Sequence, residues 1–263
     1  MSDGARADLL RELLAAIDER TPVVVATVVA TRRSVPRRAG SKMLVYGDGS
    51  ISGTIGGGEM EARVVAESLA ALAERQPRRL TYSLLDPASG DPGVCGGEVE
   101  LYLEPHMPQS TVFVVGVGHV GRAVVELAGW LGHRVVAWDD RAELVAQADL
   151  TGDEESEFLT GPIADAVATA GIDAETSIVM VTRNVVLDVE IIPALLATPA
   201  RYIGLMGSQR RWDTTRRKLG ELGIGDDDLT RIAAPIGIEI AAETPSEIAV
   251  SIMAEVIGRH RGG

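Results

Sequence analysis

The glycine-rich run at residues 116–121, Gly-Val-Gly-His-Val-Gly, constrains the fold of this chain more than any other feature. It follows the apolar run 111–115, precedes a helical pattern that extends to about residue 131, and is followed by a second apolar run at 134–138. A lone glycine motif is weak, but a strand before it and a helix and strand after it are the context of a dinucleotide-binding loop. The order therefore predicts a Rossmann-type unit.

Each glycine of this loop has its own expected role. Gly116 permits the tight turn, Gly118 lets backbone amides approach a pyrophosphate, and Gly121 allows the helix to pack closely on the strand. The N-terminus of the helix adds unpaired N–H groups and a positive dipole end. A glycine-tight turn that binds nothing is the alternative.

Three polar residues near the loop are further candidates for ligand contact. His119 lies within the loop, where a packing role is an equally good interpretation. Asp139 ends the next strand, where a carboxylate can accept hydrogen bonds from ribose hydroxyls and would repel a 2′-phosphate. Arg141, two positions on, is the competing indication of a phosphorylated ribose.

After residue 107, short apolar runs alternate with helical segments, which is typical of parallel βαβ units. Strands are expected at 111–115, 134–138, 177–182, 202–206 and about 230–233. The last helix is expected to begin at Thr244-Pro245-Ser246-Glu247, because this tetrad combines a capping hydroxyl, an initial proline and a carboxylate that can reach back. The stretch 149–157 carries five carboxylates and reads as a solvated loop or a weak edge strand.

The first 107 residues predict a mixed α+β domain. An amphipathic helix comes first, with Leu9, Leu10, Leu13, Leu14 and Ile17 at helical spacing and Arg6 on its polar face. A β-branched run at 22–30 predicts a strand buried on both faces. Further strands are expected at 42–46, 50–55, 79–84 and 98–103, with a helix at about 59–75.

Pro105 and Pro108 are typical of a linker, so the domain boundary is placed there. We predict an α/β chain in which residues 1–107 form the mixed domain. Residues 108–263 are predicted to form a Rossmann-like dinucleotide-binding domain with a doubly wound parallel sheet.

The segment 31–42, Thr-Arg-Arg-Ser-Val-Pro-Arg-Arg-Ala-Gly-Ser-Lys, concentrates five cations in a chain of net charge -13. Arg37 and Arg38 in such a loop can hold phosphate or carboxylate oxygens in bidentate fashion. A solubilising or subunit-contacting loop would explain the composition equally well.

Gly56-Gly57-Gly58 precedes a predicted helix, which is the arrangement of a backbone anion nest. Glu59 and Glu61 would lie in the first turn and repel a bound anion. Either a cation intervenes, with Gly57 and Gly58 as ligand contacts, or the glycines only make a tight turn.

Cys95 is the only cysteine, so no disulfide can form within the chain. Between glycine-rich neighbours its thiol could be nucleophilic or carry sulfur if its pKa were lowered, although a structural cysteine is the more common case. Gly207, Ser208 and Arg210, with Arg211, follow a predicted strand and could line the ligand crevice of an open α/β sheet.

Several classes of function are excluded or disfavoured. A net charge of -13 and a pI near 4.8 disfavour general nucleic-acid binding. No apolar run is long enough to cross a membrane, and the N-terminus lacks the features of a secretory signal, so a cytoplasmic protein is expected. There is no Gly-x-Ser-x-Gly elbow, no His-Glu-x-x-His and no Walker lysine. The histidines show no metal-ligand spacing.

Together these segments resemble the XdhC/CoxI family, accessory proteins for xanthine dehydrogenase and related molybdenum hydroxylases. The resemblance covers nearly the whole chain. In the first half it rests on TRRSVPRRAGSKMLV, GTIGGGEMEARV and CGGEVELYLEP. In the second half it rests on VVGVGHVGRAVVELAGWLGHRVVAWDDR, YIGLMGSQRR and APIGIEIAAETPSEIAVSIMAEVI.

The resemblance implies binding of the molybdopterin-type molybdenum cofactor, including its cytosine dinucleotide form. It also implies sulfuration of the cofactor with a cysteine desulfurase and delivery to a molybdenum hydroxylase apoenzyme. Arg37, Gly40, Glu61 and Cys95 occupy motif positions of the family. We also expect a homo-oligomer.

The chain departs from the family pattern at two places. Where many relatives read Thr-His-Asp-His before an aspartate, it has Thr182-Arg183-Asn184-Val185 and then Asp188, so any role of those histidines is absent. Glu59 stands where some relatives have a cysteine, which argues against a mechanism that needs two thiols.

We therefore predict a cofactor-binding and insertion chaperone that does not itself turn over a substrate. The alternative is an NAD(P)-binding oxidoreductase that uses the same glycine loop. Such an enzyme needs a proton donor or base, for which only Lys42 and Tyr46 are weak candidates. A dinucleotide sensor without catalysis is a third hypothesis.

Overall fold

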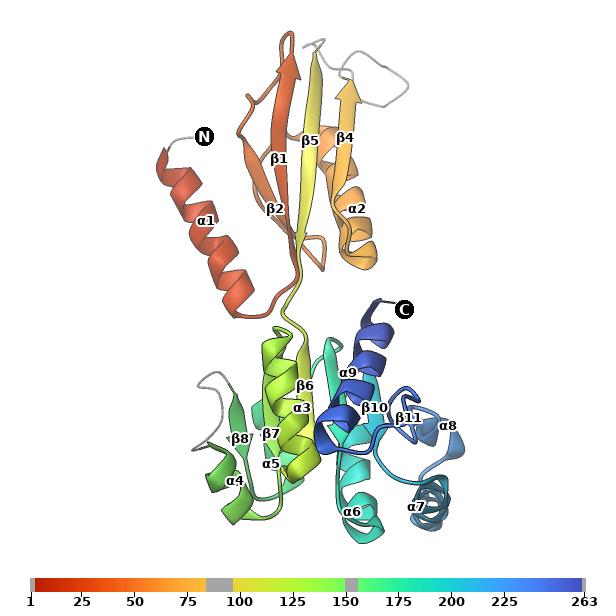
Figure 1. The fold of residues 1–263 in the computed structure, drawn as a ribbon. Helices are drawn as coiled ribbons and strands as arrows, with labels where there is room; N and C mark the ends of the chain where they lie inside the picture. The colour runs from red at the N-terminus through yellow and green to blue at the C-terminus, as the bar shows by residue number, and fades with distance from the viewer. Residues whose placement is uncertain (1–2, 84–96, 150–155, 262–263) are drawn as a thin grey trace. The chain divides into compact units, whose positions relative to one another are not determined.

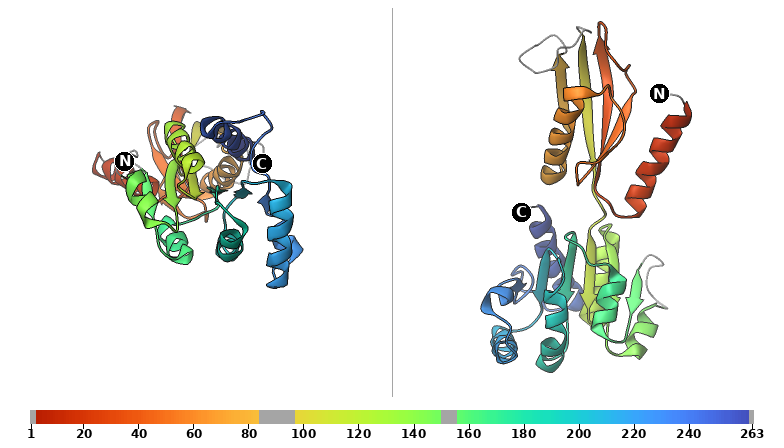
Figure 2. Two further views of the ribbon diagram at one scale, coloured as in Figure 1. Left: turned by 60° about the horizontal axis from the view of Figure 1, so that its bottom comes forward. Right: turned by 180° about the vertical axis from the view of Figure 1, so that it is seen from behind.

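The computed structural model describes residues 3–83, 97–149 and 156–261. It divides into two compact units, Met1–Pro108 and Gln109–Gly263, here called unit 1 and unit 2. Each unit has its own sheet and its own hydrophobic core (Figures 1 and 2). No helix in the described ranges has the length and apolar character needed to cross a membrane.

Unit 1 is an antiparallel sheet with one helix on each face. The strand order is β3-β2-β1-β5-β4, and every neighbouring pair is antiparallel. The strands are β1 Val23–Arg32, β2 Lys42–Tyr46, β3 Ile51–Gly53, β4 Arg78–Ser83 and β5 Glu98–His106. The helices are α1 Asp3–Asp18 and α2 Gly58–Glu74.

Successive residues of β1 alternate between the two faces of this sheet. Val24 and Val28 belong to a core cluster that includes Met60 and Val64 of α2. Val23 and Val25 belong to a separate cluster with residues of α1. The prediction of a strand buried on both faces is confirmed, because a helix covers each side.

Two expectations for unit 1 were wrong. Of the predicted apolar face of α1, Leu9 is buried, but Leu10 and Leu14 are exposed, Leu14 to 60%. Helix α1 packs mainly on β1 and β2, and its Glu12 accepts a hydrogen bond from Ser52 of β3 at 2.5 Å, so much of its apolar face stays uncovered. Pro105 is not in a linker but in β5, opposite Val24 of β1. Beyond Leu103, β5 has no pairing with β4, so proline there lies on a free edge where its missing N–H costs no ladder bond.

Unit 2 is a six-stranded parallel sheet with strand order β11-β10-β9-β6-β7-β8. The strands are β6 Thr111–Val115, β7 Arg134–Trp138, β8 Glu157–Leu159, β9 Thr176–Met180, β10 Tyr202–Leu205 and β11 Ile232–Ala233. The helices are α3 His119–Trp130, α4 Ala142–Asp149, α5 Ile163–Ala170, α6 Val185–Leu196, α7 Gln209–Glu221, α8 Asp226–Leu229 and α9 Pro245–Arg261. This is the doubly wound Rossmann order, and the predicted fold class is confirmed.

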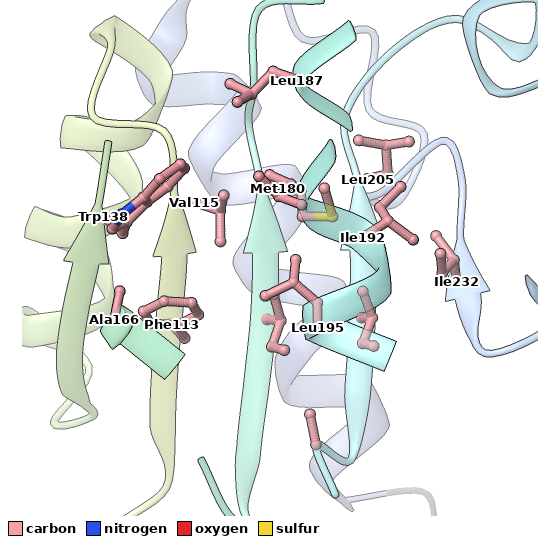
Figure 3. Packing of buried hydrophobic residues seen from close by; sticks show 14 of the residues in the cluster. Phe113, Val115, Trp138, Ala166, Met180, Leu187, Ile192, Leu195, Leu205 and Ile232 are labelled. Carbon is pink, nitrogen blue, oxygen red and sulfur yellow. The ribbon is translucent and has the colours of Figure 1, made fainter. Parts of the chain in front are cut away.

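Helices cover both faces of the parallel sheet. Phe113 and Val115 of β6 lie in a cluster with residues of α5, α6 and α7. Figure 3 shows both side chains with Ala166 of α5 and Leu195 of α6. The intervening Val112 and Val114 lie in a second cluster with residues of α3 and α9. The order in which strands are added reverses between β6 and β9, because the chain builds from β6 to β8 on one side and from β9 to β11 on the other. The crevice outside the carboxyl ends of strands at such a switch point is where ligands bind in these sheets.

Two boundary predictions for unit 2 can be compared with the structure. Helix α9 begins with the predicted capping box, since the Glu247 carboxylate accepts from the Thr244 amide at 2.8 Å and the Thr244 hydroxyl accepts from the Glu247 amide at 3.3 Å. Of the acidic stretch 149–157, residues 150–155 lie outside the described residues. Glu157 opens the short edge strand β8.

Candidate functional site

The glycine loop of unit 2 joins β6 to α3. Gly116 has a φ of 111°, and a Cβ built on it would lie 2.9 Å from the Val181 carbonyl oxygen. A Cβ built on Gly121 would lie 1.8 Å from the Gly116 oxygen. Gly118 has an extended backbone, and a Cβ there would meet no described atom within 4 Å. The predicted conformational roles of Gly116 and Gly121 agree with this geometry, while ligand binding by the loop, including His119, stays a prediction.

Asp139 holds this loop rather than facing the crevice. Its side chain is 2% exposed, and its Oδ2 accepts from the Val117 amide at 2.8 Å. The Arg141 guanidinium and amide supply the other three hydrogen bonds. Burial acts to raise the pKa of Asp139, but the bonds from Arg141 and Val117 lower it below its usual value. The predicted ribose contact is not supported, because four donors already fill the four lone-pair sites of the carboxylate.

A buried ion pair lies just beyond the carboxyl end of β9. The Arg211 Nε donates to Asp188 Oδ2 at 2.9 Å and its Nη2 donates to Oδ1 at 2.8 Å. Arg211 also donates to the carbonyl oxygen of Thr182 at 3.0 Å and to its hydroxyl at 2.7 Å, and that hydroxyl in turn donates to Asp188. Asp188 is fully buried. The cluster therefore ties the end of β9 to α6 and α7.

The other residues predicted at the end of β10 support this ion pair. A Cβ built on Gly207 would lie 2.9 Å from Arg211 Cδ, so glycine leaves room for that side chain. The Ser208 hydroxyl caps α7 by accepting from the Arg211 amide at 3.3 Å. Arg210 is exposed and its predicted contact with a ligand is untested. Sequence reasoning missed the pairing of Asp188 with Arg211, because no short motif links them.

The arginine loop of unit 1 lines a cationic pocket of about 480 Å³. The pocket residues are Arg6, Pro36, Arg37, Arg38, Ala39, Gly40 and Ser41. Arg6 comes from α1 and was assigned only to a polar helix face by the sequence. Nearby, burial and the positive charge of Arg6 lower the pKa of Lys42. The ion pairs of the described residues include neither Arg37 nor Arg38.

Backbone amides of the triple-glycine loop in unit 1 already donate hydrogen bonds to a carboxylate of the protein itself. Oε1 of Glu61 accepts from the amides of Ile55 at 3.0 Å, Gly56 at 3.2 Å and Gly57 at 2.9 Å, and from the Thr54 hydroxyl at 2.6 Å. Burial acts to raise the pKa of Glu61, but these bonds lower it below its usual value. Of the two interpretations, the tight turn is the one that the geometry supports.

The predicted contact of the Gly57 amide with an external anion is not supported, because that amide already donates to Glu61, while the contact predicted for Gly58 stays a prediction. The nest exists, but its donors on residues 55–57 are used by Glu61. Sequence reasoning treated Glu61 as a charge that would repel a ligand. It missed that a residue in the first helical turn can reach back into the loop that precedes the helix.

Changing Glu61 to Gln is expected to destabilise unit 1 by about 1–2 kcal/mol, because charge-assisted hydrogen bonds become neutral ones. The folded-state pKa of Glu61 is depressed, so its contribution is present above its unfolded pKa and is lost as the pH falls. Urea denaturation at pH 7 and pH 4 should therefore show a smaller difference between variant and parent at pH 4. The exposed Glu59→Gln is the matched control, and equal effects of the two changes would contradict the interpretation.

Three motifs of unit 1 meet at one place. A Cβ built on Gly56 would lie 3.4 Å from the Pro36 side chain. A Cβ built on Gly97 would lie 2.1 Å from the Ser34 carbonyl oxygen. The arginine loop therefore packs against both the triple-glycine loop and the start of β5. Cys95 lies outside the described residues.

Family models match both units of the chain. A model of the XdhC Rossmann domain matches residues 112–256, and a model of the XdhC and CoxI family matches residues 16–83. The Escherichia coli protein YqeB, described as uncharacterized, is 34% identical over 244 residues, which cover 91% of this chain but 44% of YqeB.

Two further matches cover most of both chains. The Escherichia coli molybdenum cofactor insertion chaperone PaoD is 26% identical over 278 residues, covering 94% of this chain and 86% of PaoD. A crystal structure described as a xanthine dehydrogenase from Bacillus halodurans superposes with a TM-score of 0.50 at 23% identity, covering 96% of this chain and 95% of that one. At this identity the superposition supports the fold alone.

Proposed function

The chain belongs to the XdhC and CoxI family, and we propose that it binds the molybdenum cofactor and inserts it into a molybdenum hydroxylase of the xanthine dehydrogenase type. The proposal includes sulfuration of the cofactor with a cysteine desulfurase. The similarity to PaoD, a molybdenum cofactor insertion chaperone, supports this role because it extends over most of both chains. The chain spans less than half of YqeB, so nothing is transferred from that longer protein.

The cationic pocket of unit 1 is the observation that carries the proposal. Three arginines from two separate segments, Arg6, Arg37 and Arg38, line one cavity in a chain of net charge -13. Guanidinium groups bind phosphate oxygens in bidentate fashion. The molybdenum cofactor carries a pterin-linked phosphate, so its charge and donor requirements fit these residues.

Changing Arg37 and Arg38 together to Gln is expected to weaken cofactor binding by about tenfold to a hundredfold, since each loses charge-assisted hydrogen bonds to the phosphate. The measurement is a titration of purified protein with molybdenum cofactor released from a donor enzyme, followed by pterin fluorescence. Arg33→Gln, in the same loop but outside the pocket, is the matched control. Undiminished binding by the double variant would refute the role of the pocket.

Delivery requires a separate measurement. Cofactor-loaded protein is expected to restore activity to an apo-hydroxylase, and addition of a cysteine desulfurase with cysteine is expected to increase the active fraction. A folded protein that binds no cofactor and restores no activity would leave the NAD(P)-binding oxidoreductase or the dinucleotide sensor as the better hypothesis. The homo-oligomeric state is tested by sedimentation of the same sample.

A further inference from the structure

An exposed ion pair crosses the base of the glycine loop in unit 2. The Arg183 Nη1 lies 2.6 Å from Asp140 Oδ1, and Nη2 lies 2.6 Å from Oδ2. Asp140 follows β7 and Arg183 follows β9, and these strands flank β6 on its two edges. The pair therefore spans the carboxyl end of β6, where the glycine loop begins and where a pyrophosphate is expected in this fold.

Asp139 and Asp140 differ in what they can still bind. The four lone-pair sites of Asp139 are filled, and its side chain is 2% exposed. Each oxygen of Asp140 accepts one hydrogen bond from Arg183, and its side chain is 32% exposed. At the end of β7, Asp140 is thus the carboxylate that retains acceptor capacity toward a ligand.

Arg183 also keeps capacity for a ligand. Its side chain is 41% exposed, and the hydrogen bonds to Asp140 use two of its five N–H donors. Exposed ion pairs contribute little to stability, so exchanging one partner for another costs little. A phosphate offers the guanidinium the same bidentate geometry as the carboxylate does.

We propose that Arg183 and Asp140 form the nucleotide-recognition element of this crevice. Arg183 moves from Asp140 to the pyrophosphate of the ligand, and the released Asp140 carboxylate accepts hydrogen bonds from the ribose hydroxyls. The ligand class is a pyrophosphate-linked nucleotide with an unphosphorylated ribose. This inference goes beyond the proposed function: it rests on the sequence prediction that the crevice of unit 2 holds a dinucleotide, and it moves ribose recognition from Asp139 to Asp140.

The test uses NAD+ and NADP+, which differ by one 2′-phosphate, in calorimetric titrations of the full chain. Asp140→Asn is expected to lower the preference for NAD+ over NADP+ by about tenfold, because the carboxylate that repels the 2′-phosphate is gone. Arg183→Gln is expected to weaken both ligands by about tenfold to a hundredfold and to leave their ratio within about threefold.

Asp226→Asn and Arg216→Gln are the matched controls. They break an exposed ion pair, with 2.8 Å between Arg216 Nη2 and Asp226 Oδ1, that lies away from the crevice. Neither change should alter the affinity for either nucleotide or the NAD+ to NADP+ preference. Circular dichroism checks that each variant is folded. The inference is overturned if Asp140→Asn keeps the parent's ratio, if Arg183→Gln keeps its affinities, or if the parent binds neither nucleotide. Cofactor binding through the unit 1 pocket is measured separately, so failure here and failure of the proposed function are distinguishable.

Discussion

Asp188→Ala is expected to destabilise unit 2 by about 3–5 kcal/mol, because it leaves the guanidinium of Arg211 buried without its counter-charge. The side chain of Asp188 is fully buried and that of Arg211 is 17% exposed. No other described carboxylate bonds to Arg211. Urea denaturation followed by far-ultraviolet circular dichroism measures the change.

A second pair of variants separates the cost of an orphaned charge from the net contribution of the ion pair. The double change Asp188→Leu with Arg211→Met removes both charges and is expected to cost far less than Asp188→Ala, since apolar replacement of a buried pair is often near neutral. Asp226→Ala, in an exposed pair, should stay within about 0.5 kcal/mol of the parent. A loss below about 1 kcal/mol for Asp188→Ala would show that water reaches Arg211.

The ion pair also illustrates which features of the site were readable from sequence. The strands of unit 2 were predicted because their apolar runs are short, continuous and separated by helical patterns. Arg211 was recognised as a residue at a strand end, but its partner Asp188 lies in another helix. Whether the guanidinium of Arg211 binds a ligand or holds β9, α6 and α7 together depends on a tertiary contact that no local sequence pattern encodes.

The same limit explains the outcomes at Asp139 and Glu61. Asp139 was expected to accept hydrogen bonds from a ribose, and Glu61 was expected to repel a bound anion. The structure shows that each one accepts hydrogen bonds from its own glycine loop, Asp139 from Val117 and Glu61 from residues 55–57. A position in a motif therefore predicted where these groups lie, but only the count of donors around each oxygen showed that they are already bonded.

Helix α1 shows a different limit, because the spacing of its apolar residues predicted more burial than the structure has. Its leucines at helical spacing predicted one broad buried face, yet Leu10, Leu14 and Ile17 are exposed in unit 1. The periodicity correctly indicated a helix. It could not indicate how much of the apolar stripe the sheet would cover, nor that Arg6 would join the arginine loop at a pocket.

In the glycine loop of unit 2, the same added methyl group is expected to have different effects at two glycines. At Gly121 it should lower stability, and at Gly118 it should lower nucleotide affinity. Gly121→Ala places a Cβ 1.8 Å from the Gly116 backbone oxygen, so strand and helix must separate. We expect a loss of about 4 kcal/mol or more, which is in the range that diagnoses a steric conflict in the core. Thermal and urea unfolding of unit 2 measure it.

Gly118→Ala is the matched test of binding rather than folding. Gly118 has a φ of -75°, which alanine adopts, and its Cβ would meet no described atom within 4 Å, so the stability should stay within about 1 kcal/mol of the parent. The methyl group would instead occupy the space through which a pyrophosphate approaches the amides at the start of α3, so nucleotide affinity should fall by about tenfold or more. If Gly118→Ala binds nucleotides as the parent does while Gly121→Ala unfolds, the fingerprint serves packing alone and the ligand of unit 2 must be sought elsewhere on its surface.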